Sequence, residues 1–304
     1  MKISGFTFVK NADKFYFPIK ESIESILPIV DEFVIAYAEG DVDDKTLEKI
    51  QAIDSPKIKI YHREWDSKDF IDGKIYRTET NFALSKCVGD WCFYLQADEV
   101  VREDQLDYIV TACQQNLNDD KVDGLLFKYL HFWGDYDHYL PYHGWYRREI
   151  RLIKNNRNIY SIKDAQSFRK GDNQKLSVKE LDAHIHHYGW VRPPQIMKSK
   201  KKEQDVIHWG KKEEEKDYKQ MVTGFDYGPL GNIAIYNGKH PKVMSDFIQN
   251  IFWKEELNYT KTKKGTDPVT HKHEKIKYRM LSWIENNLLG GKSLFGYSNW
   301  ILKK

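Results

Sequence analysis

The chain has 304 residues, enough for a full domain with an appendage. Its 48 basic and 45 acidic side chains leave a formal net charge of +3, so we expect no nucleic-acid partner. A mean hydropathy of −0.70 and the lack of a long apolar run argue against a membrane-spanning helix. The amino-terminal residues are too few and too polar for a signal peptide. The three cysteines lack metal-ligand spacing and suit buried thiols, so the sequence indicates a cytoplasmic protein.

The amino-terminal part alternates between strand-like and helix-like segments. Strands are predicted over residues 3–9, 32–37, 57–61 and 91–95. Helices are predicted over residues 75–87 and from the spacing of Ile19, Ile23, Ile26 and Val30, of Leu47, Ile50 and Ile53, and of Leu106, Ile109, Val110 and Cys113. Such alternation implies right-handed crossovers and a largely parallel sheet, so the expected fold class is α/β.

The pattern then changes. Strands predicted over 124–130 and 149–154 flank an aromatic, His-rich loop at 133–146. Loops of this composition usually bind a ligand or pack under a lid. A further strand is predicted over 181–188, and Pro193 and its neighbouring proline end it.

The chain is expected to divide into a main domain, residues 1–194, and a mostly helical extension, residues 195–304, that packs on the core. A run of mixed charges over 198–220 predicts a solvated helix. An apolar helical stripe consists of Ile276, Met280, Trp283, Ile284 and Leu288. The stripe favours packing on the core, and docking on a membrane is the alternative.

The most informative stretch is the apolar run from Trp91 to Leu95, which leads into two adjacent carboxylates, Asp98 and Glu99. In an open α/β sheet, ligands bind at the carboxyl ends of the strands, which is where these side chains fall. Carboxylate oxygens there can hold a hard divalent cation against the phosphates of a substrate. The alternative is that they begin the next helix, because acidic residues favour helix N-termini.

Several short segments occur in an order and spacing that are typical of one family. They are Phe8-Val9-Lys10-Asn11, Ser22 and Ser25, the segment from Val34 to Thr46, Thr80-Asn81, Gly89-Asp90 and Gln96-Ala97-Asp98-Glu99. From the amino terminus to about residue 190, the chain resembles glycosyltransferase family 2, the inverting nucleotide-sugar transferases of the GT-A fold. The resemblance implies a Rossmann-like, mostly parallel mixed sheet flanked by helices.

The resemblance also implies a site for the nucleoside of a nucleotide-sugar donor. Val9 and Asn11 fall at the end of the first strand, where the backbone of the family meets the base. The family's second-strand Asp is missing here, and Glu39 is the nearest carboxylate to its place.

Further residues are implied around the donor's diphosphate. Arg77 and Asn81 fall in the helix before the metal motif, and Arg77 and Arg192 could each meet the diphosphate. Gln96 stands where the family has its first metal-motif Asp, which leaves Asp98 as the main acidic ligand.

The expected chemistry needs a cation and a base. The resemblance implies that Asp98 and His187 hold Mn²⁺ or Mg²⁺, which would neutralise the leaving diphosphate. Glu149 is the first candidate to take the proton of the acceptor hydroxyl, and Asp164 is the next. Both carboxylates could instead be structural.

We therefore expect a metal-assisted, inverting glycosyltransferase of polysaccharide biosynthesis. Its acceptor would be a saccharide or a lipid-linked saccharide, with peripheral contact to the inner face of a membrane as an accompanying expectation. Two alternatives stay open. The chain could be a non-catalytic protein that binds nucleotide or glycan, or His184 and His186 could form part of a zinc site in a hydrolase.

Overall fold

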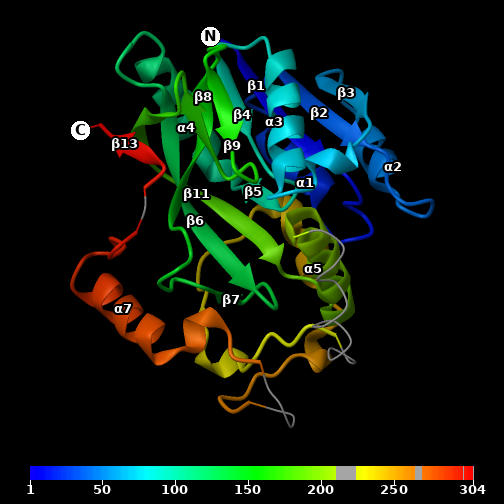
Figure 1. Ribbon diagram of the computed structural model, residues 1–304, viewed down its shortest axis with the longest axis vertical. Coiled ribbons are helices and arrows are strands. Elements are labelled where there is room, and N and C mark those ends of the chain that lie inside the picture. Colours follow the sequence, from blue (N-terminus) through cyan, green and yellow to red (C-terminus); the bar gives the residue numbers. More distant parts are fainter. Residues whose placement is uncertain (210–223, 264–268, 297, 304) are drawn as a thin grey trace.

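The computed structural model describes residues 1–209, 224–263, 269–296 and 298–303. Its amino-terminal part is a parallel sheet in the order β3-β2-β1-β4 with helices on both faces (Figure 1). The strands are β1 (Ile3–Val9), β2 (Glu32–Ala38), β3 (Ile58–Arg63) and β4 (Trp91–Tyr94). The helices are α1 (Ile19–Ile26), α2 (Thr46–Gln51), α3 (Lys74–Lys86) and α4 (Leu106–Asn116).

The sheet continues beyond β4 through strands of mixed direction. They are β8 (Arg148–Lys154), β6 (Gly124–Trp133), β11 (Gln174–Trp190), β10 (Ser167–Lys170) and β9 (Ile159–Ile162). Because β8 is antiparallel to both β4 and β6, and β11 is parallel to β6, the carboxyl ends of β1, β4, β6 and β11 share one edge. A mixed sheet flanked by helices confirms the predicted α/β class.

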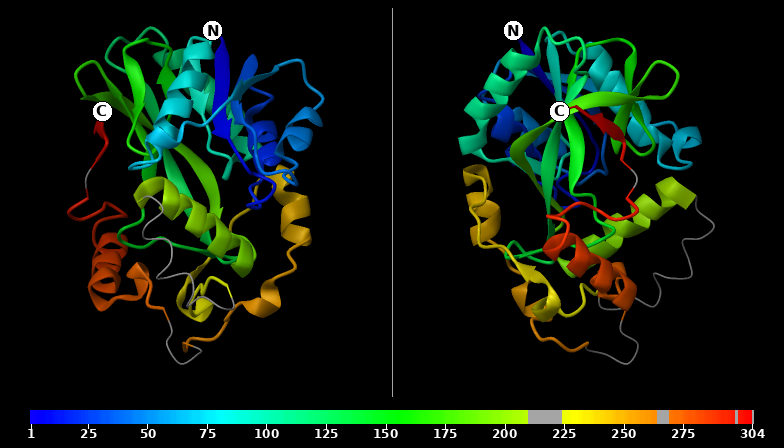
Figure 2. Two further views of the ribbon diagram at one scale, coloured as in Figure 1. Left: turned by 45° about the vertical axis from the view of Figure 1, so that its right-hand side comes forward. Right: turned by 90° about the vertical axis from the view of Figure 1, so that its left-hand side faces the viewer.

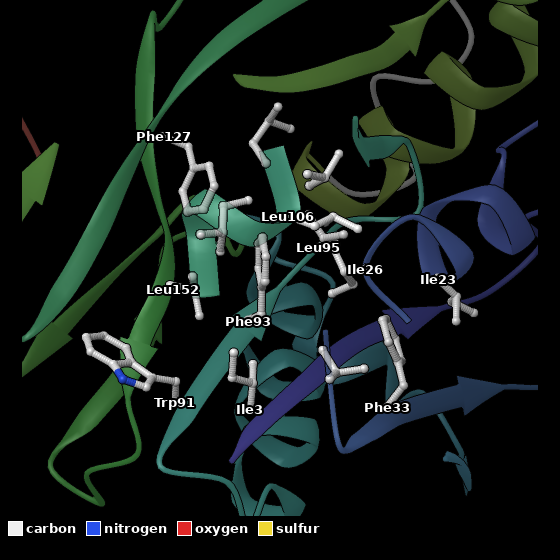
Figure 3. Close-up of a cluster of buried hydrophobic side chains, with 14 of the residues drawn as sticks. Ile3, Ile23, Ile26, Phe33, Trp91, Phe93, Leu95, Leu106, Phe127 and Leu152 are labelled. Carbon is white, nitrogen blue, oxygen red and sulfur yellow. The ribbon is translucent and has the colours of Figure 1, made fainter. Parts of the chain in front are cut away.

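The two faces of the sheet are buried in separate hydrophobic clusters, because side chains alternate along each strand. On one face, Phe93 and Phe127 pack with Ile26 of α1 and Leu106 of α4 (Figure 3). On the other, Tyr94 and its neighbours from β1, β6 and β8 pack against α3 and the hairpin of β9 and β10. The sheet is therefore a rigid platform, and its carboxyl edge has a fixed geometry.

The carboxyl-terminal part gathers at one end of the molecule, with β13 returning to the sheet (Figure 2). Its elements are α5 (Pro194–Trp209), β12 (Ala234–Ile235), α6 (Ser245–Gln249), α7 (Ile276–Asn287) and β13 (Trp300–Leu302), with β12 pairing β7 (His138–Tyr139). Short 3₁₀ helices span Ser67–Asp69, Glu103–Gln105, Leu230–Asn232, Lys242–Met244, Lys254–Glu256 and Lys272–Glu274. A third buried cluster joins Trp133 and Tyr188 to Met197, Leu230 and Trp253.

The structure tests two expectations for the carboxyl-terminal part. The charged run predicted as a helix over 198–220 coincides with α5 up to residue 209, and its remainder lies outside the described residues. The expectation that the stripe of α7 packs on the core is wrong, because Ile276, Met280 and Trp283 are exposed. Of the helices in the described residues, none is long and apolar enough to cross a membrane.

A buried ion pair ties the carboxyl edge of the sheet together. The guanidinium of Arg151 on β8 donates to both carboxylate oxygens of Glu99 at 2.7 Å, and neither side chain is more than 1% exposed. Glu99 belongs to β5 (Glu99–Val101), and it also accepts from the Tyr129 hydroxyl at 2.8 Å and the Gln96 amide at 3.1 Å. With these partners, the carboxylate is fully hydrogen-bonded away from water.

Removing one partner would leave a charge buried without compensation. We expect Arg151→Met to lower the free energy of unfolding by about 3–5 kcal/mol. The double variant Glu99→Gln/Arg151→Met should recover much of this loss, because no charge then remains buried. Urea denaturation measures both. The control is Arg148→Met, on β8 like Arg151, which breaks a half-buried pair with Glu180 of β11 and should cost about 1 kcal/mol or less. If Arg151→Met lowered the free energy of unfolding no more than Arg148→Met does, the stabilising role of the buried ion pair would be contradicted.

Candidate active site

A cavity of about 470 Å³ lies at the carboxyl ends of β1 and β4. The chain runs outward from β1 to β2 and β3 and then crosses back to β4 on the other side of β1. The space between β1 and β4 is therefore the switch point at which open α/β sheets bind ligands. Residues around the cavity include Val9, Lys10, Trp65, Tyr76, Gln96, Asp98, His131, Trp145, Tyr146, Arg151, Asp164, Gln166, His187, Trp190, Lys200 and Glu203.

Asp98 faces this cavity, and its neighbour Glu99 does not. The chain turns after β4 and returns as β5, which pairs antiparallel with β11 so that Glu99 lies opposite His187. Glu99 begins β5 and its carboxylate meets Arg151, whereas Asp98 lies in the turn just before β5 and lines the cavity. The two carboxylates that the sequence places together thus have separate roles.

His187 is held beside Asp98 by a chain of hydrogen bonds. His131 on β6 lies opposite His187 on β11, and their Nδ1 atoms are 3.1 Å apart. The Nε2 atom of His131 lies 2.6 Å from the carbonyl oxygen of Tyr146. Burial lowers the pKa of both imidazoles, so both are neutral at neutral pH.

These contacts fix which nitrogen of each ring carries hydrogen. A carbonyl can only accept, so Nε2 of His131 is the donor to Tyr146, and its Nδ1 is an acceptor. His187 must then donate through Nδ1, which leaves a lone pair on its Nε2. That Nε2 lies 3.8 Å from Oδ2 of Asp98.

Two electron-pair donors therefore face one another across 3.8 Å. Burial alone would raise the pKa of Asp98, but the positive charges nearby, Lys200 and Arg192 among them, outweigh it and lower the pKa, so Asp98 is a carboxylate. A carboxylate and an unprotonated imidazole do not attract one another, but both are ligands of divalent cations. The pair fits a cation held between them. In the described part of the chain, no three His, Cys, Asp or Glu side chains form such a group, so a ligand would have to complete the coordination.

Glycine is required at position 189 by this arrangement. A Cβ atom added to Gly189 would lie 2.5 Å from Cε1 of His187 and 2.8 Å from Oδ2 of Asp98. Any other residue would push apart the two groups that face the cavity.

Two cations act on Asp98, the buried Arg192 and the half-buried Lys200. The amine of Lys200 on α5 lines the cavity and donates to the carbonyl of Gly189 at 2.9 Å. Burial and the charge of Arg192 lower the pKa of Lys200 to about 7. Arg192 is fully buried and donates through Nη1 to the carbonyl of Phe15, but its Nε and Nη2 have no hydrogen-bond partner within the part of the chain that the structure describes. Such cations favour an anionic ligand, because buried charges otherwise lack compensation.

Asp164 enters the cavity from the tight turn between β9 and β10. The residues on either side of it, Lys163 and Ala165, have positive φ angles of 53° and 62°. Such conformations cost free energy in residues other than glycine and occur often at functional sites. Oδ2 of Asp164 lies 3.6 Å from Nε2 of His208 on α5, and this contact lowers the pKa of the carboxyl group.

Aromatic side chains form one wall of the cavity. Trp145 and Tyr146 come from the loop at 133–146, and Trp190 comes from the end of β11. The Trp145 and Trp190 rings meet edge to face, with centroids 5.7 Å apart. Only this end of the aromatic loop reaches the cavity, since Trp133 and Tyr136 pack in the third hydrophobic cluster.

The structure brings together only some of the residues that the sequence singled out. The set that lines the cavity is Val9, Gln96, Asp98, Asp164 and His187. The set that does not line it is Asn11, Glu39, Arg77, Asn81, Glu149 and Arg192.

Among the nucleoside and helix candidates outside the cavity, Asn11 and Asn81 make contacts that hold the fold together. Asn11 accepts from the Asp41 amide at 2.8 Å, and Glu39 is exposed. Asn81 exchanges two hydrogen bonds with the backbone of Ser161, which ties α3 to β9. Arg77 is half-buried on α3.

Glu149, the first candidate for the base, is buried within the sheet. It accepts from the Ser167 hydroxyl at 2.7 Å, from the Ile150 amide at 3.0 Å and from the Asn299 amide at 3.3 Å. Burial raises the pKa of its carboxyl group. These contacts use the carboxylate to join β8 to β10 and to the carboxyl-terminal segment.

His184 and His186, the pair considered for zinc, do not line the cavity. His186 is buried, and its Nε2 lies 3.1 Å from the Tyr236 hydroxyl. The described residues contain no further ligand grouped with the two histidines, so the zinc alternative has no support in this geometry.

Sequence reasoning missed the roles of His131 and Lys200. His131 carries no local signal, since its partner lies 56 residues away. Lys200 lies among other lysines, so composition does not single it out, but the helical period of α5 does. Met197 and Ile207 are buried, and a period of 3.6 residues places Lys200 and Gln204 on the same face of α5.

Comparisons with known proteins give a distant likeness in fold. No protein-family model matches the chain, and no curated protein matches it. S. aureus TarS 1-349 in complex with UDP-GlcNAc is similar over 68% of this chain and 66% of that one, at 13% identity and a TM-score of 0.39.

Shorter likenesses exist to two synthases. Mannosyl-3-phosphoglycerate synthase from Rubrobacter xylanophilus matches 45% of this chain and 42% of its own, at 20% identity and a TM-score of 0.30. Glucosyl-3-phosphoglycerate synthase from Mycobacterium tuberculosis, in complex with Mn²⁺, UDP and glucosyl-3-phosphoglycerate, matches 43% and 44%, at 16% identity and a TM-score of 0.28. The chain thus spans less than two thirds of each. At these values the likenesses assign neither a family nor an activity, which must be argued from the site itself.

Proposed function

We propose that the chain is a glycosyltransferase that moves a sugar from a nucleotide-diphosphate donor to a saccharide acceptor. The observation that carries the proposal is the facing pair of Asp98 Oδ2 and His187 Nε2, 3.8 Å apart at the switch point of the sheet. A carboxylate and a neutral imidazole at the cavity, with the cations Lys200 and Arg192 acting on that carboxylate, suit a diphosphate that arrives with a divalent cation.

In this proposal Asp98 and His187 would hold Mn²⁺ or Mg²⁺, with diphosphate oxygens completing the coordination. When bound, the cation would act as a Lewis acid that stabilises the negative charge of the leaving diphosphate. Lys200 and Arg192 would add fixed positive charge on the same side, which requires no reorganisation during the reaction. Gln96, which lines the cavity as a neutral side chain, leaves the carboxylate of Asp98 as the main acidic ligand.

The acceptor half of the reaction needs a base and a binding surface. Asp164 lines the cavity as a carboxylate, whereas Glu149 is enclosed by its hydrogen bonds, so Asp164 is the stronger candidate to take the hydroxyl proton. Trp145, Tyr146 and Trp190 offer faces on which a sugar ring can stack. Attack opposite the leaving diphosphate would invert the anomeric carbon. The acceptor in this proposal is a saccharide or a lipid-linked saccharide.

The first test removes the charge of Asp98 without changing its shape. We expect Asp98→Asn to lower sugar transfer, or hydrolysis of the donor, by about 10²–10³-fold. In a thermal-shift screen of nucleotide sugars, the wild type should be stabilised by one donor with Mn²⁺ and the variant should not. Asp120→Asn, at an exposed position, is the control.

Unchanged transfer by Asp98→Asn would refute the cation assignment. A wild type that binds a nucleotide sugar with Mn²⁺ but never cleaves it would favour the alternative of a non-catalytic binding protein.

The second test concerns the hydrogen bond that orients His187. His131→Leu removes the acceptor for Nδ1, so we expect affinity for Mn²⁺ in the presence of UDP to fall about 10–100-fold. His131→Asn, whose side-chain oxygen can take the place of Nδ1, should recover part of the affinity. Electron paramagnetic resonance of free Mn²⁺ measures the titration. Equal losses in both variants would mean that His131 contributes only packing.

The third test asks whether Lys200 meets the diphosphate. Lys200→Met should weaken binding of UDP without metal about 10–100-fold and leave binding of uridine unchanged. Lys201→Met, in which the lost amine pairs with Asp205 outside the cavity, is the control. Because the pKa of Lys200 is lowered to about 7, the protonated amine is lost as the pH rises through about 7. Wild-type affinity should therefore fall over that range, and the Lys200→Met variant should not follow it.

A further inference from the structure

Helix α7 is attached to the protein through its polar face. Glu285 is fully buried, with its carboxylate 2.6 Å from Nδ1 of His143 and 3.1 Å from Nη2 of Arg147. The hydroxyl of Ser282 is also buried, and it accepts from the backbone amide of His143 at 2.8 Å. These contacts fix the orientation of the helix about its axis.

The apolar stripe of α7 consequently points away from the protein. Ile276, Met280 and Trp283 follow one another at spacings of four and three residues, which places them on one face. They are 78%, 61% and 59% exposed. Leu288, just past the end of the helix, is 65% exposed. A helix of a globular protein normally turns such a face to the core, so this arrangement is the reverse of the usual one.

The helix is displayed as a fixed surface feature and not as a loose tail. Figures 1 and 2 show α7 at the periphery of the molecule. Beyond it, β13 pairs with the beginning of β11, so Trp300 lies beside Leu176. Before the helix, Nε2 of His271 lies 2.7 Å from the carbonyl oxygen of Asp226, so the chain is anchored on both sides of the exposed stripe.

Positive charge surrounds the stripe. The cations are Lys272, Lys275, Lys277, Arg279 and Lys292, all exposed. The acidic residues of segment 269–296, which is described throughout, are Glu274 and Glu285. Glu274 accepts from the His271 amide and lies 3.6 Å from Lys263, while Glu285 is buried in its pairs with His143 and Arg147. The outward surface of α7 is thus apolar along its middle and cationic along its margins.

We infer that α7 docks on the surface of a bilayer that carries anionic lipids. Exposed Ile, Met and Trp side chains on one face, with Lys and Arg beside them, are the features of a helix that lies in a membrane interface. The apolar side chains would enter the acyl boundary, and the cations would meet the headgroup phosphates. A second copy of the chain fits less well, because an isologous contact would bring the two sets of cations against each other.

This inference does not depend on the proposed enzymatic activity. His143 and Arg147, which hold α7, flank Trp145 and Tyr146 of the cavity wall.

Co-sedimentation with vesicles tests the inference on the full chain. The wild type should sediment with vesicles of equal parts phosphatidylcholine and phosphatidylglycerol, much less at high salt, and not with phosphatidylcholine alone. Met280→Ser/Trp283→Ser should weaken this binding about tenfold or more, because two large apolar side chains no longer leave water. Lys275→Glu/Lys277→Glu should abolish the preference for phosphatidylglycerol.

Matched controls separate the stripe from general surface effects. Phe252→Ser removes a side chain that is 68% exposed elsewhere on the surface, and Lys2→Glu/Lys121→Glu reverses two exposed charges away from α7. Both controls should bind vesicles as the wild type does, and circular dichroism should show every variant folded. Binding that is equal in stripe and control variants would overturn the inference. So would a wild type that ignores anionic vesicles and forms a dimer that Met280→Ser/Trp283→Ser dissociates.

Discussion

The carboxyl edge of the sheet depends on the buried pair of Glu99 and Arg151. An ionised carboxylate in the interior is tolerated only with a partner of opposite charge and a full set of hydrogen bonds. Arg151, Tyr129 and the Gln96 amide supply both. With Glu99 held by these partners, Asp98, in the turn just before β5, lies beside the cavity. One stabilising interaction thus decides which of two adjacent carboxylates can meet a ligand.

The charges nearest Asp98 favour an anionic ligand. Its single carboxylate is within the influence of two cations, Lys200 and Arg192, and Arg192 has nitrogen atoms with no hydrogen-bond partner among the described residues. The relay from Tyr146 through His131 leaves His187 with a free lone pair toward Asp98. Both features would be costly in an empty protein, and a diphosphate with its cation would compensate both. Charges that are already in place for the ligand need no reorganisation during the reaction.

The reversed orientation of α7 follows from the same rule that governs Glu99. Glu285 finds its cationic partner, Arg147, only at the inner face of the helix, and His143 adds a second contact. Burying that charge without those partners would cost more than exposing three apolar side chains. The polar face is therefore turned inward, and the apolar face is left exposed.

The sequence by itself determined the local elements and the place of the site. Its apolar periodicity predicted the strands and helices of the parallel half, and the abrupt end of the apolar run before Asp98 marked the edge where the cavity lies. Strand alternation also predicted that His187 lies on the opposite face of its strand from His184 and His186. The tertiary structure decided the rest: that Glu99 is structural, that Glu149 is enclosed, that His131 orients His187, and that α7 faces outward. Each of these depends on a partner 50 or more residues away, as between Glu99 and Arg151 or between His143 and Glu285. Periodicity reports which face of a segment is apolar, but it carries no information about the distant group that a polar side chain will meet.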